Sequence, residues 1–267
     1  MHLYLFYGRR PPVEQVLDSL KTLLSLLFIL LCLGLILFFF FSSRGRTKPN
    51  LREIQAFRRL RREVDLAVEA GKRLHISLGR GTINDLQGGA AFIGLTILDR
   101  SARAASNGDR PPMVSSGDGV LTILSQDTLQ YTYQSLVAEQ RYDPTNARLT
   151  GLTPLAYAAG CVPIIQDEHV SANIFAGHLG TEVALLTEAG ERSQSLTVAG
   201  TDSIHAQAVL FASSDEPLLG EELYAAGAYL GAGMAHSASL RMQDIVRWVL
   251  IAAILIGAFI TLIGLLP

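Results

Sequence analysis

LHISLGRGTIN, residues 74–84, has the pattern of a buried strand that ends in a glycine turn just before a helix. The same order of strand, glycine and helix start recurs in MVSSGDG (residues 113–119), ANIFAGHLGTE (residues 172–182) and LTVAGTD (residues 196–202). Strands that alternate with helices form right-handed βαβ units around a parallel sheet. The sequence therefore predicts an α/β fold with a Rossmann-like parallel sheet.

The ends of these predicted strands carry the candidate ligand-binding residues. In an open parallel sheet, ligands bind at the carboxyl ends of the strands, where glycine lets the backbone approach a ligand and helix N-termini favour anions. The residues placed there are Gly79, Arg80, Gly81, Thr82, Ser116, Gly117, Asp118, Gly119, Gly177, His178, Thr181, Glu182, Thr201 and Asp202. The alternative is that these residues only build turns and helix caps.

Two apolar stretches outside the predicted sheet exclude a wholly soluble protein. Leu23–Phe41 and Trp248–Leu266 each contain 19 residues, and a helix of that length spans about 28 Å, close to the thickness of a hydrocarbon core. We therefore expect an extracytoplasmic arm (residues 1–22), a first transmembrane helix (23–41), a basic juxtamembrane linker with an amphipathic helix (42–73), a cytoplasmic α/β domain (74–244) and a second transmembrane helix (245–267).

Basic residues near the first span set the expected orientation. Three Lys and Arg residues precede the span and eight follow it, up to Arg62, and the flank rich in basic residues is normally cytoplasmic. We expect a two-pass protein of the plasma (inner) membrane, with both termini outside and the domain in the cytosol. The two cysteines, Cys32 in the span and Cys161 in the domain, fit a reducing compartment.

The net negative charge of the predicted α/β domain excludes a nucleic-acid-binding domain. Residues 74–244 contain eight Arg against eighteen Asp and Glu, so the domain lacks the basic face that phosphate backbones require. The basic excess lies in residues 44–73, where Asn50 and Glu53 resemble a capping box and an amphipathic helix is predicted to run to Gly71. The polar face of this helix contacts either solvent or anionic lipid headgroups.

Catalytic and cofactor motifs are mostly missing. Gly79–Asn84 resembles a dinucleotide fingerprint, but Asn84 stands where a third small residue is required. There is no P-loop and no nucleophile elbow, and two distant cysteines cannot form a cysteine zinc site. We therefore predict no metal site, and the sequence leaves the cofactor unknown.

Three polar clusters have both a functional and a structural interpretation. His178 and Glu182, four residues apart, either share a metal or stabilise a helix start. Asp118 either binds Mg²⁺ or a ribose hydroxyl, or caps the next helix. Asp167-Glu168-His169 is expected to form a solvated loop, because three consecutive side chains cannot face one point.

The segment Glu221–Ser239, just before the second span, is rich in small residues. Gly227 with Gly231, and Ala228 with Ala232, form small-xxx-small pairs that let helices approach closely. We predict that these four residues pack a helix either against its own sheet or against a neighbouring subunit, which makes them candidates for an oligomer interface.

Four stretches resemble a known family. They are EAGKRLHIS (residues 69–77), SGDG (116–119), DEHVSANI (167–174) and GEELYAAGAY (220–229). They are similar to stretches in an uncharacterised prokaryotic family of two-span membrane proteins, known as a domain of unknown function. The resemblance extends from about Asn50 to the second span and implies the same architecture, without an activity.

Two functions are consistent with these features. The lack of an intact catalytic motif favours a membrane-anchored binding or scaffold domain that contacts membrane lipid and works as a homo-oligomer or in a membrane complex. Polar residues at four strand ends favour the alternative, an enzyme that acts on a phosphorylated or nucleotide-like small molecule. A small polar ligand is compatible with both.

Overall fold

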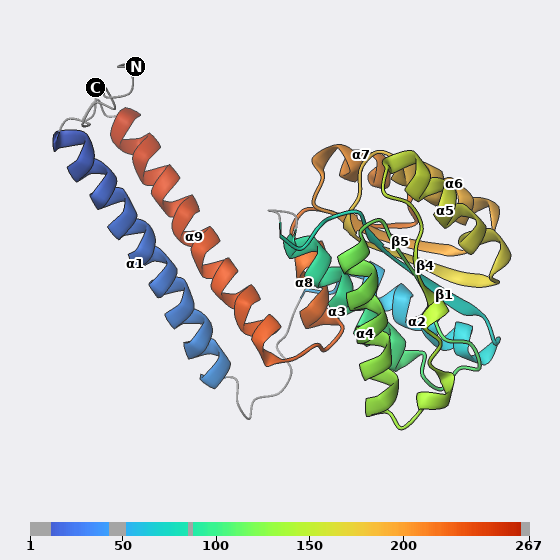
Figure 1. Cartoon of the computed structure of the whole chain (residues 1–267). Coiled ribbons are helices and arrows are strands. Elements are labelled where there is room, and N and C mark those ends of the chain that lie inside the picture. The colour runs from blue at the N-terminus through green and yellow to red at the C-terminus, as the bar shows by residue number, and fades with distance from the viewer. Residues whose placement is uncertain (1–11, 43–51, 85–87, 263–267) are drawn as a thin grey trace, which may run out of the picture. The chain divides into compact units, whose positions relative to one another are not determined.

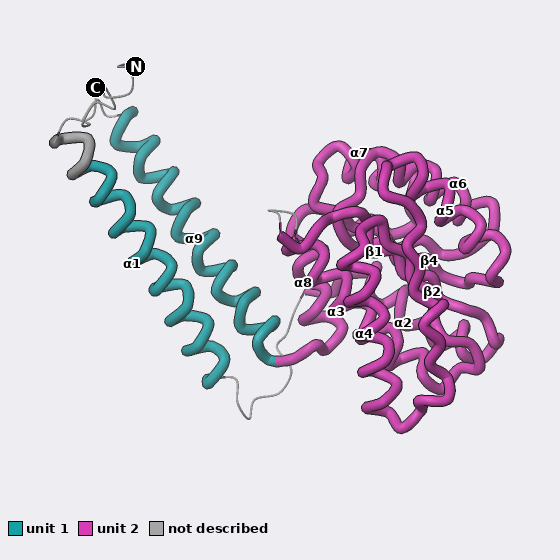
Figure 2. Tube along the Cα trace, in the orientation of Figure 1, with its two compact units in different colours: residues 1–49, 234–267 teal, residues 50–233 magenta. Residues whose placement is uncertain are grey.

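The computed structural model describes residues 12–42, 52–84 and 88–262, with side chains from residue 17 onward. The chain divides into two compact units (Figure 2). One unit combines the two ends of the chain, Met1–Pro49 and Met234–Pro267, and the other is Asn50–Gly233. The predicted α/β fold lies within Asn50–Gly233.

A six-stranded parallel sheet forms the centre of the α/β unit (Figure 1). Its strands are β1 Arg73–Gly79, β2 Met113–Ser116, β3 Ala147–Leu149, β4 Val170–His178, β5 Leu196–Thr201 and β6 Glu216–Leu218. They lie in the order β3-β2-β1-β4-β5-β6, and all neighbouring pairs are parallel. This is the strand order of the Rossmann fold, in which the order reverses between β1 and β4. The predicted fold class is confirmed.

Helices cover both faces of the sheet. They are α2 Gln55–Glu69, α3 Gly88–Ala104, α4 Gly119–Ser135, α5 Pro154–Asp167, α6 Val183–Arg192, α7 Ile204–Ser213 and α8 Glu222–Tyr229, with short turns of 3-10 helix at Glu139–Arg141 and Pro144–Asn146. Side chains of α2, α3, α4 and α8 share a core with Ile76 and Ile174, whereas α5, α6 and α7 pack with Phe175 and Ala199. Alternate strand residues point to opposite faces, so the sheet contributes to both cores.

Several predicted helix boundaries shift in the structure. The sequence predicts that Asn84 and Gln87 cap the helix after β1, but α3 begins only at Gly88, and Gln87 lies outside the described residues. The helix after β2 is predicted to run to about Glu139, but α4 ends at Ser135. The short strands β3 and β6 were not predicted, because three residues are too few to show an alternating pattern.

α2 belongs to the α/β unit and not to a linker. Phe57, Leu60 and Val64 are buried in the core beneath the sheet, and the compact unit therefore begins at Asn50 rather than at the predicted boundary, Leu74. The helix begins at Gln55. Its N-cap residue is Ile54, whose side chain makes no capping hydrogen bond, so Glu53 does not complete a capping box there. Asn50 lies outside the described residues.

Arginines on the polar face of α2 bind other parts of the domain. Arg59 pairs with Glu216 of β6 at 2.7 Å, and Arg61 donates a hydrogen bond to the carbonyl oxygen of Tyr229 at the end of α8. The Tyr229 ring stacks on Phe57, with ring centroids 5.1 Å apart. These contacts hold α2 against β6 and α8. Part of the polar face that was predicted to contact solvent or lipid therefore contacts the domain itself.

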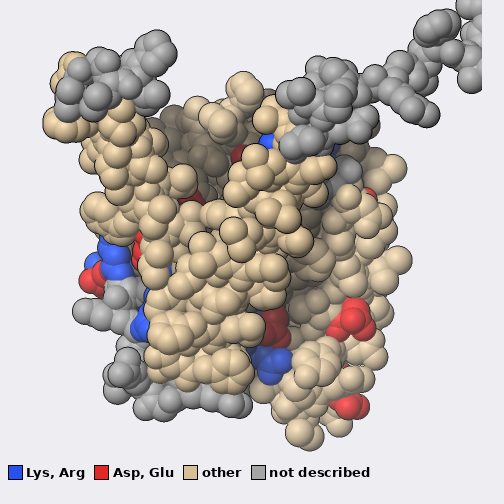
Figure 3. Space-filling model, turned by 90° about the vertical axis from the view of Figure 1, so that its left-hand side faces the viewer, with Lys and Arg blue, Asp and Glu red and all other residues tan. Residues whose placement is uncertain are grey.

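The other unit consists of two long antiparallel helices, α1 Pro12–Ser42 and α9 Met234–Leu262, which pack side by side (Figure 1). Leu17–Ser42 and Met234–Leu262 are both long and apolar enough to cross a membrane. Figure 3 shows this side of the molecule as mostly tan, with Lys, Arg, Asp and Glu side chains visible at only a few places. The first helix covers the predicted span at 23–41, and the second begins well before residue 245.

The small-residue segment is not one helix. α8 ends at Tyr229 and α9 begins at Met234, and between them Gly231 adopts φ 74° while the Ala232 N–H donates to the Gly227 carbonyl oxygen at 2.7 Å. The two predicted pairs therefore do not share a helix face, and that part of the prediction is wrong. A contact between subunits at these residues stays a prediction.

Candidate functional site

The carboxyl ends of β1 and β4 approach each other unusually closely. Gly79 has φ 73°, and a Cβ atom on it would collide with the carbonyl oxygen of His178. A Cβ atom on Gly177 would collide with the carbonyl oxygen of Leu78. Only glycine fits such positions. The Arg80 N–H donates a hydrogen bond to the carbonyl oxygen of His178 at 2.8 Å, which joins the two strand ends. Gly79 and Gly177 thus allow the close approach of β1 and β4, the two strands between which the strand order reverses.

A buried phenol from α5 fills the space beneath this point. The Tyr157 hydroxyl hydrogen-bonds to Ser77 and accepts from the Gly79 N–H at 3.2 Å. Complete burial raises the pKa of Tyr157 well above its usual value, so the hydroxyl keeps its proton. The sequence patterns gave no indication of this residue, because it lies in a helix far from the strand ends along the chain.

Arg80 and Glu182 form an ion pair above the same point. Arg80 Nε lies 2.9 Å from Glu182 Oε1, and the Gly180 N–H donates to the same oxygen at 3.0 Å. The side chain of Glu182 is 7% exposed and that of Arg80 is 20% exposed. Burial acts to raise the pKa of Glu182, but the hydrogen bonds and the positive charge of Arg80 together hold it below its usual value. The carboxylate therefore stays ionised and fixes the guanidinium.

His178 and Asp202 pair at the ends of β4 and β5. His178 Nδ1 lies 2.7 Å from Asp202 Oδ1, and the two side chains are 22% and 18% exposed. Burial and, to a smaller extent, the nearby charge of Asp202 raise the pKa of Tyr224 of α8. The Tyr224 ring is also 3.7 Å from where a Cβ atom of Gly89 would lie, at the start of α3. Four elements therefore meet around this pair.

Other predicted site residues perform local structural roles. Asp118 accepts from the Leu121 N–H at 2.9 Å and so caps α4. The Ser116 hydroxyl bonds to Thr122 of the same helix at 2.6 Å. The Thr201 hydroxyl bonds to both backbone groups of Leu179 at 3.0 Å. The remaining candidates lie in the same turns and helix starts; they are Gly81, Thr82, Gly117, Gly119 and Thr181. The capping interpretation fits Asp118.

The cluster Asp167-Glu168-His169 comprises the last residue of α5 and the turn that follows it, and Asp167 and His169 are exposed there, as expected of a solvated segment. Asp167 is the last residue of α5, and Glu168 pairs with Arg148 at 3.2 Å and with Arg73 at 3.8 Å. His169 adopts φ 56° in the following turn. The carboxylate of Glu168 thus pairs with two arginines that the sequence pattern did not connect with it.

In the part of the chain that the structure describes, no three His, Cys, Asp or Glu side chains come together as metal ligands. His178 and Glu182, which are spaced to share a metal, bind different partners. His178 pairs with Asp202, and Glu182 pairs with Arg80. This pair of residues is therefore not arranged around one ion.

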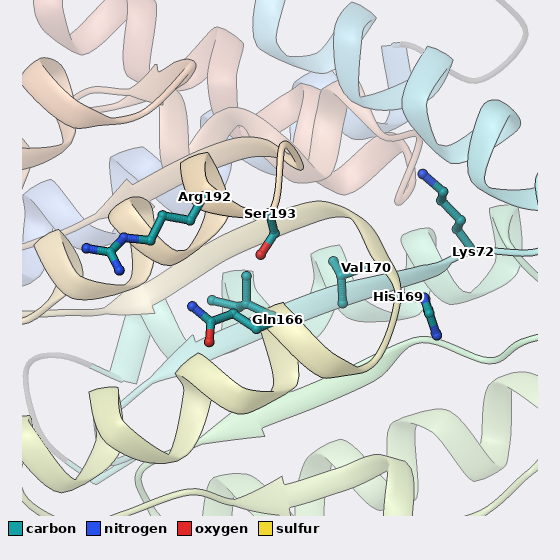
Figure 4. A pocket seen from close by; sticks show the side chains of 7 residues that line it. Lys72, Gln166, His169, Val170, Arg192 and Ser193 are labelled. Carbon is teal, nitrogen blue, oxygen red and sulfur yellow. The ribbon is translucent and has the colours of Figure 1, made fainter.

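A cavity of about 400 Å³ lies at the opposite, amino edge of the sheet (Figure 4). It is lined by Lys72, Ile165, Gln166, His169, Val170, Arg192 and Ser193. Lys72 and Arg192 lie at opposite ends of the groove in Figure 4, and Arg192 pairs with Glu188 at 2.6 Å. The basic groups therefore do not converge on one ligand position.

Gly94 of α3 is a further residue that motif searching missed. A Cβ atom there would collide with the carbonyl oxygen of Ala176, so glycine lets α3 lie directly on β4. Close packing of helix and strand is the role of the third glycine in the dinucleotide fingerprint. The signal available in the sequence was the group of small residues Gly88–Ala91 followed by Gly94, which lies outside the fixed spacing of the fingerprint.

One of the three comparisons with known proteins finds a match. Neither the curated proteins nor the solved structures contain a match to the chain. A family model described as "Domain of unknown function (DUF6754)" matches residues 12–266, which is nearly the whole chain. The chain therefore belongs to the DUF6754 family.

Proposed function

We propose that the chain is a membrane-anchored cytoplasmic α/β domain that binds partners rather than catalyses a reaction. The main support is that the polar groups at the strand ends bind one another. Arg80 pairs with Glu182, His178 pairs with Asp202, and Asp118 caps α4. A catalytic site would instead direct several such groups at one reacting atom.

Anchoring by the two long helices supports a role at the plasma (inner) membrane. Both helices are long and apolar enough to cross a bilayer. The excess of basic residues that follows the first span favours a cytosolic domain and contact with anionic lipid. In this proposal the protein assembles with copies of itself or with a membrane complex.

Native mass spectrometry from mild detergent tests the assembly. We expect the full chain to appear as a defined multimer of the 28.9 kDa protomer. The control is another membrane protein of known oligomeric state in the same detergent. If that control stays oligomeric and this protein is uniformly monomeric, self-assembly is contradicted. Co-purification of a second membrane protein at fixed stoichiometry would support the complex instead.

Cysteine labelling tests the orientation. Asp143 is exposed, the native Cys161 is buried and the native Cys32 lies in the apolar helix α1, so labelling of Asp143→Cys is compared with labelling of the wild type. A membrane-impermeant maleimide should label it only after the cells are permeabilised. Labelling of intact cells would place the domain outside. Arg9→Cys, in the arm expected outside, is the matched control and should react in intact cells.

An enzyme that acts on a phosphorylated or nucleotide-like molecule is the second candidate. It is supported by the Rossmann strand order, together with two partly exposed polar side chains, Arg80 and His178, at the reversal point. A small molecule retained at fixed stoichiometry in the native mass spectrum would favour this candidate.

A further inference from the structure

The terminal nitrogens of Arg80 have no hydrogen-bond partner among the residues that the structure describes. Its Nε donates to Glu182, and in the part of the chain that the structure describes neither Nη atom makes a hydrogen bond. Buried polar side-chain atoms without a partner are found there only at Arg73, Arg100 and Thr197. The Nη atoms of Arg80 are therefore not enclosed, and they reach solvent through the 20% of the side chain that is exposed.

The surrounding residues hold this guanidinium in one orientation. The Arg80 backbone is bonded to His178, and its side chain lies over Gly117, where a Cβ atom would collide with Arg80 Cγ. Glu182 then fixes Nε at 2.9 Å. The free edge of the planar guanidinium carries parallel N–H groups that match the two oxygens of a carboxylate or phosphate. A pre-oriented, water-accessible arginine thus lies where the strand order reverses.

We propose that Arg80 binds a single oxyanion group, a carboxylate or a phosphate monoester, of a small molecule at the carboxyl edge of β1 and β4. The local charge limits the ligand to one such group. Glu182 already neutralises Arg80, and Asp202 adds a second carboxylate on the neighbouring strand end. A polyphosphate would be repelled by these carboxylates. The inference rests on the proposed binding role and names the chemistry of the ligand.

Arg103 provides a matched control within the same domain. Its Nε also binds a carboxylate oxygen, that of Asp99, at 2.8 Å, and its side chain is 28% exposed. Its Nη1 atom, however, donates to the Ser135 hydroxyl at 2.9 Å. The two arginines thus share an ion-pair geometry and differ in that one terminal nitrogen of Arg103 is occupied.

The test measures binding of inorganic phosphate and of acetate to the full chain in detergent at constant ionic strength, by calorimetry and by the shift in unfolding temperature. We expect saturable binding by the wild type, and pyrophosphate no tighter than phosphate. Arg80→Gln should weaken binding about tenfold or more, because a charge-assisted bidentate contact is lost. Arg103→Gln should leave the affinity unchanged.

Two results would overturn the proposal: no saturable binding of either anion by the wild type, or equal affinity in Arg80→Gln. If Arg80→Gln does not fold, Arg80→Lys decides the question, since an ammonium keeps the charge but loses the paired donors. Equal affinity in Arg80→Lys would exclude bidentate binding. The oligomer mass is measured without added phosphate. Failure of anion binding can therefore be distinguished from failure of the proposed assembly.

Discussion

The imidazole Nε2 of His75 lies 2.9 Å from the Ser115 hydroxyl oxygen, so a titratable ring is enclosed in the middle of the sheet. On its other side, His75 Nδ1 lies 3.2 Å from Asn173 Oδ1, and the Asn173 amide donates to Ser195 at 2.7 Å. Because the amide nitrogen is used there, Asn173 presents its oxygen to His75. Nδ1 therefore carries the proton, and Nε2 accepts from Ser115.

We expect the stability of the domain to fall in mild acid because of His75. Burial lowers its pKa from 6.5 to about 4, although the bond to Asn173 acts in the opposite direction. The unfolded chain therefore takes up the proton first, so this stability is fully present above pH 6.5 and is lost as the pH falls toward 4. The difference corresponds to roughly 3 kcal/mol.

Thermal unfolding of the full chain between pH 4 and 7.5 measures this loss. His75→Gln, which does not titrate, should be less stable at neutral pH and should show a flatter dependence on pH. His205→Gln, at an exposed position on α7, should keep the wild-type slope. The assignment to His75 fails if His75→Gln and the wild type lose stability in parallel.

Val137→Gly should stabilise the protein. Val137 is 93% exposed and adopts φ 55° just after α4, where its N–H donates to Gln134 at 3.0 Å. A β-branched residue in this left-handed conformation costs about 1–2 kcal/mol, and glycine removes that cost without losing a buried contact. Chemical denaturation should show a gain of about 1 kcal/mol. Gln194→Gly, at φ 52° after α6, should give a smaller gain, and an unchanged midpoint for Val137→Gly would contradict the strain.

Gly94→Ala should destabilise the domain by about 1–3 kcal/mol, the usual cost of overpacking. The added methyl group would meet the carbonyl oxygen of Ala176, which cannot move without displacing β4. Gly89→Ala, on the same helix, is the control, since its nearest contact would be the Tyr224 ring at 3.7 Å. It should be neutral or slightly stabilising, because alanine favours a helix more than glycine does. Equal losses in the two variants would show that helix propensity rather than contact with β4 decides the effect.

Asp118→Ala should lower the stability by about 1 kcal/mol and leave phosphate binding unchanged. Its carboxylate caps α4 at 2.9 Å, whereas the cap of α5, from Thr153 to the Ala156 N–H, is longer at 3.4 Å. Thr153→Ala should therefore cost less. If Asp118→Ala instead loses phosphate affinity and keeps the wild-type stability, Asp118 is a ligand-binding residue.

Gly231→Leu should lower the stability by about 1–2 kcal/mol through backbone strain at φ 74°. Gly231→Asn should be tolerated better, because asparagine enters this conformation more readily. Unfolding midpoints test the strain, and native mass spectra of both variants test the predicted interface. If both remain folded and keep the wild-type oligomer mass, Gly231 does not lie between subunits.

The sequence by itself determined those elements whose physical signal is local. The repeated order of a short strand, a glycine and a helix start predicted β1, β2, β4 and β5, and long apolar runs predicted α1 and α9. These signals are readable because a strand or a membrane helix is selected by the residues within it. The strands β3 and β6 escaped because three residues carry too little of that pattern.

Only the tertiary structure decided which side chains meet. Arg80 and Glu182 are 102 residues apart, and their pairing depends on β1 and β4 becoming neighbours in the sheet. The same holds for Tyr157, which is 80 residues from Ser77 yet fills the space beneath the strand ends. Contacts between distant residues follow from the order of the strands and the packing of helices across them. That order is set by burial of the whole core and not by any one segment.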